Sequence, residues 1–153
     1  MNIAPLEEQY VSRYDELAGE SGTIFNSAKW ISLFGHKIQP LGIYNDNEEL
    51  IGGFHLYMEK KFGLTICRNA PFTPHCGPFL KVVAKNPVAI RDNWKKALSL
   101  MASYIESRSL SVVSISLDNH IIDTQPFFWR EFKVIPGYTY LIDLALPVDA
   151  ILK

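Results

Sequence analysis

The sequence has few cysteines, almost no net charge and no long apolar run. Two cysteines, Cys67 and Cys76, are too few for a disulfide framework, which favours a reducing, cytoplasmic setting. A formal net charge of -1 provides no basic field of the kind that attracts nucleic acid, so we expect no sequence-specific nucleic-acid partner. No stretch approaches the roughly 18 continuous apolar residues that a membrane-spanning helix needs. We therefore expect a cytoplasmic protein without a transmembrane segment.

Apolar residues, by contrast, are plentiful. They make up 48% of the 153 residues, which is enough for one substantial core and too little chain for two full domains. We expect a single domain over residues 1–146. The last residues, 147–153, are interpreted as the start of a helix or a linker that leads onward, because a helix of one turn is not stable alone.

The order of predicted elements gives a fold class. Apolar residues at helical spacing predict helices over 5–17, from about 27 to 34, over 87–108 and near 124–131, while strand patterns cover 39–44, 50–60, 64–68, 111–117 and 138–144. In the second strand Leu50 is expected to share a face with Phe54, and Ile51 the opposite face. The long helix links two strands by a crossover, as in a parallel pair. The order predicts an α/β (α+β) fold with a mixed sheet.

One loop between two predicted strands, 69–78, is unusually rich in proline and in reactive side chains. A zinc site built from Cys67, His75 and Cys76 is disfavoured because the paired ligand spacings are missing, and we assign no metal. Cys76 is a candidate nucleophile only if a histidine from elsewhere reaches it, since its neighbour His75 points the other way in an extended chain; the alternative is a buried space-filling thiol.

A phosphate cradle is also disfavoured, because no glycine-rich turn opens the long helix and Pro87 lacks a backbone donor. The remaining interpretation is recognition of a ligand by a stiff loop, against the alternative of a plain sheet connection. The candidate substrate-binding residues are Trp30, Phe72, Thr73, His75, Cys76, Gly77, Tyr138 and Tyr140. Trp30 and the two tyrosines also fit ordinary core and sheet positions. We find no carboxylate pair for acid/base work and assign no catalytic residue.

Four segments resemble the first half of Fem-type proteins, which are bacterial transferases with two GNAT-like (N-acetyltransferase-type) domains in tandem. They are Ile24-Phe25-Asn26-Ser27 with Trp30, Glu49-Leu50-Ile51-Gly52-Gly53, the loop Pro71 to Gly77, and Tyr138 to Leu144. The resemblance covers nearly the whole chain. It implies a GNAT-like, mixed and mostly antiparallel sheet flanked by helices, with a second GNAT-like domain beyond residue 153 or a homodimer in its place.

The resemblance also implies a role. GNAT enzymes hold the pyrophosphate of acyl-CoA with an Arg/Gln-x-x-Gly-x-Gly/Ala turn before the long helix, and here that turn reads Leu80-Lys81-Val82-Val83-Ala84-Lys85-Asn86-Pro87. The expected function is therefore to shape the site of a small-molecule or cell-wall-precursor acceptor, with no cofactor in this chain. Acetyl-CoA or aminoacyl-tRNA would serve the complete two-domain protein, and this chain alone would be inactive. The alternatives are a single-domain N-acetyltransferase that uses acetyl-CoA and a non-catalytic interaction module.

Overall fold

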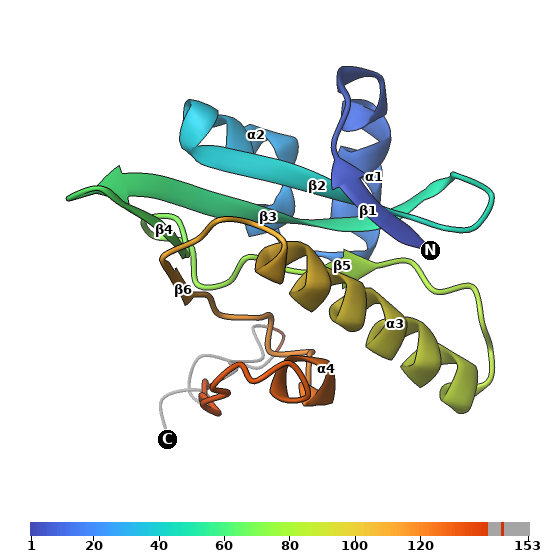
Figure 1. The fold of residues 1–153 in the computed structure, drawn as a ribbon. Coiled ribbons are helices and arrows are strands. Elements are labelled where there is room, and N and C mark those ends of the chain that lie inside the picture. The colour runs from blue at the N-terminus through green and yellow to red at the C-terminus, as the bar shows by residue number, and fades with distance from the viewer. Residues whose placement is uncertain (141–144, 146–153) are drawn as a thin grey trace.

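A mixed sheet forms the middle layer of the protein, with helices on both faces (Figure 1). The computed structural model describes residues 1–140 and 145. The strands in this part of the chain are β1 (Asn2–Pro5), β2 (Ile38–Tyr44), β3 (Leu50–Lys61), β4 (Leu64–Arg68), β5 (Phe79–Leu80) and β6 (Val112–Ser114). They are ordered β1-β2-β3-β4-β6, and β5 pairs with β3 beyond the end of β4. The predicted α/β class with a mixed, mostly antiparallel sheet is confirmed.

Antiparallel pairing joins β1 to β2, β2 to β3, and β3 to both β4 and β5. The parallel pair is β4 with β6, where Cys67 lies opposite Val113. The helix α3 (Pro87–Glu106) makes the crossover between these two strands, as the sequence predicts. Its start at Pro87 follows from the side chain of Asn86, which accepts a hydrogen bond from the Val88 amide and caps the first turn.

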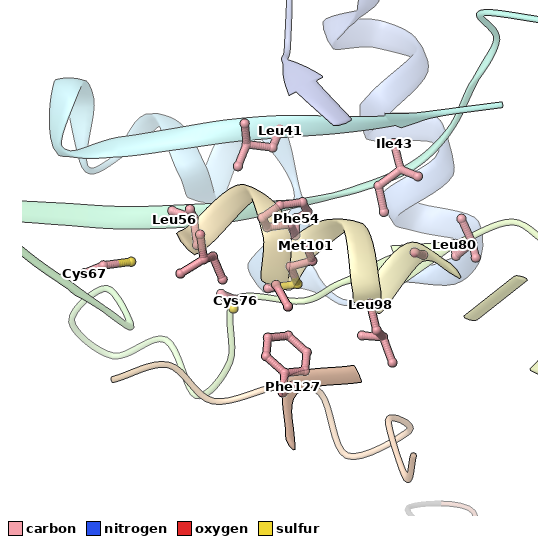
Figure 2. Close-up of a cluster of buried hydrophobic side chains, with 13 residues drawn as sticks. Leu41, Ile43, Phe54, Leu56, Cys67, Cys76, Leu80, Leu98, Met101 and Phe127 are labelled. Carbon is pink, nitrogen blue, oxygen red and sulfur yellow. The ribbon is translucent and has the colours of Figure 1, made fainter. Parts of the chain in front are cut away.

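Two apolar clusters hold the layers together. The cluster between the sheet and α3 contains Phe54, Leu98 and Met101 and extends to Phe127 of the short helix α4 (Gln125–Phe128) (Figure 2). The second cluster lies under α1 (Val11–Ser21) and α2 (Ala28–Ser32), with Tyr14 and Leu17 at its centre. Three 3-10 turns complete the described elements: η1 (Glu8–Tyr10), η2 (Ile24–Asn26) and η3 (Gly35–Lys37).

A bulge in β3 corrects the predicted face of its first residues. Ile43 pairs with Gly52 but Tyr44 pairs with Leu50, so Ile51 is the extra residue on β3. Leu50 consequently packs in the α1 and α2 cluster, whereas Ile51 packs against the α3 cluster with Phe54. Strict alternation along the strand had placed Leu50 and Phe54 on one face, and that prediction is wrong because the bulge reverses the alternation.

The beginning and end of the chain also differ from the sequence pattern. Residues 2–5 form an edge strand, and the first α-helix begins at Val11 instead of Pro5 and ends at Ser21. Of the strand predicted over 138–144, residues 138–140 have no regular structure and 141–144 lie outside the described residues, as does the predicted onward segment 147–153. Among the described helices, none has the length and apolar character needed to cross a bilayer.

Candidate functional site

The loop after β4 is fastened to the segment that follows β6. The side chain of Asn69 donates to the Pro74 carbonyl at 2.8 Å and accepts from the Ser116 amide at 3.0 Å. The Cys76 amide donates to the Ser116 carbonyl at 3.0 Å, and the Asp118 amide donates to the Gly77 carbonyl at 3.1 Å. These bonds continue the contact of β4 with β6 past the end of both strands. The backbone groups that would otherwise offer a ligand an open edge here are therefore used within the protein.

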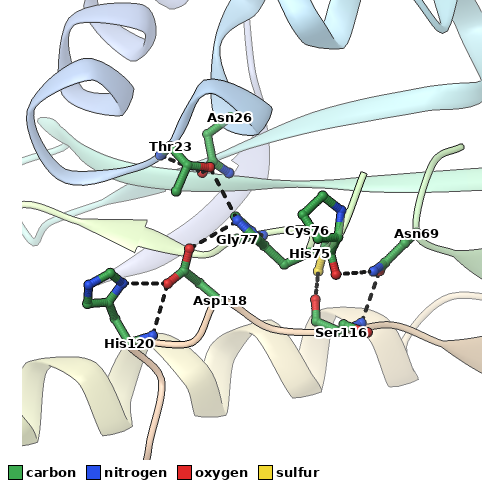
Figure 3. A network of polar contacts seen from close by, with 10 residues as sticks. Thr23, Asn26, Asn69, His75, Cys76, Gly77, Ser116, Asp118 and His120 are labelled. Carbon is green, nitrogen blue, oxygen red and sulfur yellow. Dashed lines mark hydrogen bonds and ion pairs between the residues drawn. The ribbon is translucent and has the colours of Figure 1, made fainter. Parts of the chain in front are cut away.

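His75 lies at the centre of this region and is nearly buried (Figure 3). Its Nδ1 accepts a hydrogen bond from the Gly77 amide at 3.2 Å, so in the neutral ring the proton is on Nε2. That nitrogen is 3.1 Å from Oδ2 of Asp118 and 3.3 Å from Oγ1 of Thr23. Burial lowers the pKa of His75 and outweighs the opposing pull of the Asp118 carboxylate. We infer a neutral imidazole that donates to Asp118.

Asp118 is a single carboxylate shared by two histidines. Its Oδ1 accepts from the backbone amide of His120 at 2.9 Å and from Nδ1 of the same residue at 2.7 Å. Burial acts to raise the pKa of Asp118, but the hydrogen bonds that it accepts from the backbone and the side chain of His120 contribute to lowering it overall. The carboxyl group therefore stays ionised and fixes the orientation of the His120 ring.

A pocket of about 770 Å³ opens beside His120, between α3 and residues 120–125. Its wall is largely apolar and includes Ile90, Trp94 and Ile121. Arg91 and Lys95 add positive charge. Lys95 is already engaged with Gln125 at 3.1 Å and with Asp123 at 3.5 Å. Arg91 makes no hydrogen bond or ion pair with the part of the chain that the structure describes, and its guanidinium is therefore available to a ligand.

Gly77 allows the loop to approach the 3-10 turn η2 closely. Its φ is +97°, and a Cβ there would stand 2.9 Å from Nδ2 of Asn26. Asn26 is buried and its Oδ1 accepts from both the amide and the hydroxyl of Thr23, at 3.1 and 3.2 Å. A larger residue at position 77 would strain the backbone at this φ and crowd the Asn26 side chain.

Phe72 lies at the outer part of the same loop, and Trp30 of α2 contacts the loop. Phe72 is 93% exposed and has a φ of +58°, a conformation that non-glycine residues seldom adopt. The indole of Trp30 donates to Oγ1 of Thr73 at 3.0 Å and packs edge-on against Phe25 at 5.2 Å. The loop thus presents one aromatic ring to solvent above a fixed Trp30–Thr73 contact.

The remaining predicted site residues are Cys76, whose side chain is buried in the core, and two tyrosines outside the loop. Cys76 is buried in the α3 cluster, its thiol donates to the Ser116 carbonyl at 3.4 Å, and burial raises its pKa to about 12. Such a thiol is a space-filling core group and not an activated nucleophile. Tyr138 and Tyr140 are fully exposed and have no contact with the loop that the structure records. No cluster of three or more metal-ligating side chains occurs among the described residues. The structure thus brings together Trp30, Thr73, His75 and Gly77.

Sequence reasoning missed Thr23, Asn26, Asp118 and His120. Asp118 and His120 follow the last residue of a predicted strand with one residue between them, and an Asp-x-His pair at a strand end is the signal that could have identified them. Their partner His75 belongs to a distant part of the chain, so only the fold shows that one carboxylate serves both rings.

The N-terminus of α3 offers little to a diphosphate. Pro87 has no backbone N–H, the Val88 amide is taken by the Asn86 side chain at 2.9 Å, and the Ile90 amide donates to the Asn86 carbonyl at 3.0 Å. The Lys81 amide, just before this turn, is also used, by the Ile51 carbonyl of β3 at 2.8 Å. The backbone donors that would hold an anion at a helix start are mostly absent or occupied.

Comparison with known proteins bears on the fold. No protein-family model matches the sequence, and no curated protein sequence matches it. Among solved structures, a ribosomal-protein-alanine N-acetyltransferase from Brucella melitensis biovar Abortus 2308 is similar, with a TM-score of 0.55 and 16% identity over 94% of this chain and 100% of its own. A Trypanosoma brucei acetyltransferase is similar with a TM-score of 0.50 and 14% identity over 94% and 99% of the two chains. The chain therefore has the fold of the GNAT acetyltransferases.

Proposed function

We propose that this chain is the GNAT-like domain of a Fem-type acyl or aminoacyl transferase and that it shapes the acceptor site without a pyrophosphate loop of its own. The observation that carries the proposal is the start of α3. Pro87 removes one backbone donor there and the side chain of Asn86 occupies the next. A GNAT fold that keeps the long helix but not its anion site is suited to a task other than holding acyl-CoA.

In this proposal, the loop 69–78 contacts the acceptor. Its hydrogen bonds to Ser116 and Asp118 hold it in place, and its prolines limit the entropy that is lost when a ligand binds. Phe72 offers an exposed ring at the surface of this rigid frame. An exposed aromatic ring on a rigid backbone gives a large contact area, and only its side chain remains to be ordered on binding.

The wider assignment follows the resemblance to Fem-type proteins. The acceptor is a small molecule or a cell-wall precursor, and the donor, acetyl-CoA or aminoacyl-tRNA, binds to another GNAT-like domain of the complete protein or to a second copy of this chain. Domains that share a site are expected to bury surface against one another, and a fragment of such a pair tends to dimerise. These assignments rest on the resemblance in addition to the geometry.

A single-domain N-acetyltransferase is the second candidate. It is favoured by the coverage of the Brucella N-acetyltransferase, whose whole length aligns with this chain. Such an enzyme would have to bind acetyl-CoA without the usual backbone cradle at α3. The two candidates therefore differ in one measurable property, the affinity of this chain for acetyl-CoA.

Calorimetric titration of acetyl-CoA into the chain separates the two candidates. We expect no saturable heat at millimolar cofactor, because Pro87 provides no backbone donor at the start of α3 and the Val88 amide is occupied by the Asn86 side chain. Saturable binding with one-to-one stoichiometry would overturn the proposal and make the single-domain acetyltransferase the better assignment. Titration of coenzyme A without its acetyl group is the control for binding through the nucleotide portion alone.

The acceptor assignment has a matched pair of variants. Phe72 and Phe62 are exposed to 93% and 92% and both have positive φ, but Phe62 lies in the β3–β4 turn and not in the loop. In the complete protein, Phe72→Ala is expected to weaken binding of a soluble cell-wall precursor peptide about tenfold, whereas Phe62→Ala leaves it unchanged. Equal affinities for the two variants would remove the loop from the acceptor site.

A further inference from the structure

We propose that His120, oriented by Asp118, accepts the proton of an acceptor amine in the pocket between α3 and residues 120–125, and that Arg91 holds an anionic group of the same acceptor. The inference rests on the proposed acyl transfer. It adds the group that takes the proton and the chemical class of the acceptor, an amine that also carries a carboxylate or phosphate.

Among the described residues, Nδ1 of the His120 ring has a partner and Nε2 has none. Nδ1 is 2.7 Å from Oδ1 of the ionised Asp118 and therefore carries the proton of the neutral ring. Nε2 is left with its lone pair, on the side of the ring away from Asp118 (Figure 3). The side chain is 80% exposed and lines the pocket, so a ligand can reach this nitrogen. A carboxylate that fixes the tautomer of an accessible imidazole is the arrangement of a general base.

Asp118 is in turn held in place from its other side. His75 donates from Nε2 to Oδ2 at 3.1 Å, and the Asp118 backbone is tied to Gly77 at 3.1 Å. The carboxylate therefore cannot rotate away when His120 becomes protonated, and its charge stabilises the imidazolium. Asp118 and His75 are positioning residues, while His120 is the group that contacts the acceptor.

The pocket suits an acceptor with an apolar body and a negative end. Ile90, Trp94 and Ile121 supply apolar wall, and the guanidinium of Arg91 has no protein partner within the described chain. The acidic group at the pocket, Asp123, is 3.5 Å from the ammonium of Lys95, so its charge is offset. Positive charge is thus left over at Arg91, and a guanidinium pairs readily with a carboxylate or phosphate.

The chemical step balances with an activated acyl ester or thioester as the donor. The neutral amine nitrogen attacks the carbonyl carbon, the N–C bond forms, and the surplus proton on nitrogen passes to Nε2 of His120. The bond from the carbonyl carbon to the leaving oxygen or sulfur breaks, and the leaving group departs with the bonding pair. The proton then passes from His120 to the leaving group or to solvent, which restores the neutral ring.

The test uses this chain with a small activated donor, so that no acyl-CoA site or second domain is needed. p-Nitrophenyl acetate is the donor, 6-aminohexanoate is the acceptor, and the N-acetylated product is measured by mass spectrometry. We expect His120→Gln to lower the rate of product formation at least tenfold. His36→Gln is the matched control, because His36 is also exposed but lies on η3, away from the pocket, and its rate should equal that of the wild type.

The anionic contact is tested with the same assay. Arg91→Gln should raise the concentration of 6-aminohexanoate that gives half-maximal rate about tenfold, and should raise the corresponding concentration of hexylamine, which has no carboxylate, much less. Arg108→Gln, a change at an exposed arginine just past the other end of α3, is the control. An equal effect of Arg91→Gln on both amines would overturn the role of Arg91.

A spectroscopic measurement follows the histidine itself. In nitrogen-15 NMR spectra at a pH where the ring is neutral, His120 should show the tautomer protonated at Nδ1, and Asp118→Asn should weaken that preference. A wild-type ring without this tautomer, or a wild-type rate no higher than that of His120→Gln, would overturn the proposal. Neither result depends on acetyl-CoA, so the inference and the proposed acceptor function can fail separately.

Discussion

His55 lies in the middle of β3, fully buried, and neither of its ring nitrogens has a hydrogen-bond partner among the described residues. Burial and, to a smaller extent, the nearby His75 lower its pKa from 6.5 to about 4. Between these two values the unfolded chain binds more protons than the folded one, so stability decreases as the pH falls. From pH 7 to pH 4 the loss attributable to this residue is on the order of 3 kcal/mol.

His55→Leu should remove that dependence. The leucine is apolar, of similar size and has no proton to take up, so the free energy of unfolding should fall less steeply between pH 6.5 and 4 than in the wild type. Urea denaturation at a series of pH values measures the slope. Parallel curves for the two proteins would mean that some other group causes the acid sensitivity.

The contact between α1 and the sheet depends on a glycine in β3. A Cβ at Gly53 would stand 2.3 Å from a ring carbon of Tyr14 and 2.6 Å from the Leu41 carbonyl oxygen. Both neighbours are fully buried and cannot move aside. Gly53→Ala should therefore lower the free energy of unfolding by about 3 kcal/mol, as overpacking in a closed core does.

Gly19, on the exposed side of α1, provides the contrast. It is exposed on α1, and a Cβ there meets nothing within 4 Å. Gly19→Ala should raise the free energy of unfolding by roughly 0.5–1 kcal/mol through the lower entropy cost of ordering alanine in a helix. Chemical denaturation of both variants checks the pair, and a destabilised Gly19→Ala would contradict the account.

At the scale of elements, the sequence predicted what local periodicity determines. The long helix, the β2–β3 hairpin and the crossover to β6 follow from apolar spacing and turn residues, and each is present within a few residues of its predicted bounds. Edge strand β1 has only four residues and β5 only two, too few to show a period. The bulge at Ile51 arises from pairing with β2, a contact that no local pattern contains.

The candidate site shows the same division. The prolines of the loop 69–78 predicted that it is stiff, and the structure adds the hydrogen bonds of Asn69 that hold it in place. The sequence could not predict the partners of His75, because Thr23 and Asp118 lie far from it along the chain. Pairing of side chains across a fold depends on strand order and crossover handedness, which composition and spacing leave open.

At the scale of the whole molecule, two buried thiols can show whether the loop and the sheet unfold together. Cys67 lies in β4 and Cys76 in the loop, both in the α3 cluster, and burial raises their pKa values to about 11 and about 12. If the loop unfolds only with the sheet, both thiols should react with an alkylating reagent at one rate, and only upon global unfolding.

Pulsed alkylation in increasing urea, followed by mass spectrometry of the two peptides, measures both rates in one sample. Equal protection would show that the hydrogen bonds of Asn69 and Cys76 make the loop part of the cooperative core. Faster modification of Cys76 than of Cys67 would instead show that the loop opens on its own while the sheet stays folded.

Asp118 connects two regions that the chain keeps apart, because one carboxylate oxygen faces His75 of the loop and the other faces His120 at the pocket. When His120 becomes protonated, its charge polarises the Asp118 carboxylate toward the pocket. The hydrogen bond that Asp118 accepts from His75 becomes weaker. The two histidines therefore communicate through a single charge, with no movement of helices or strands.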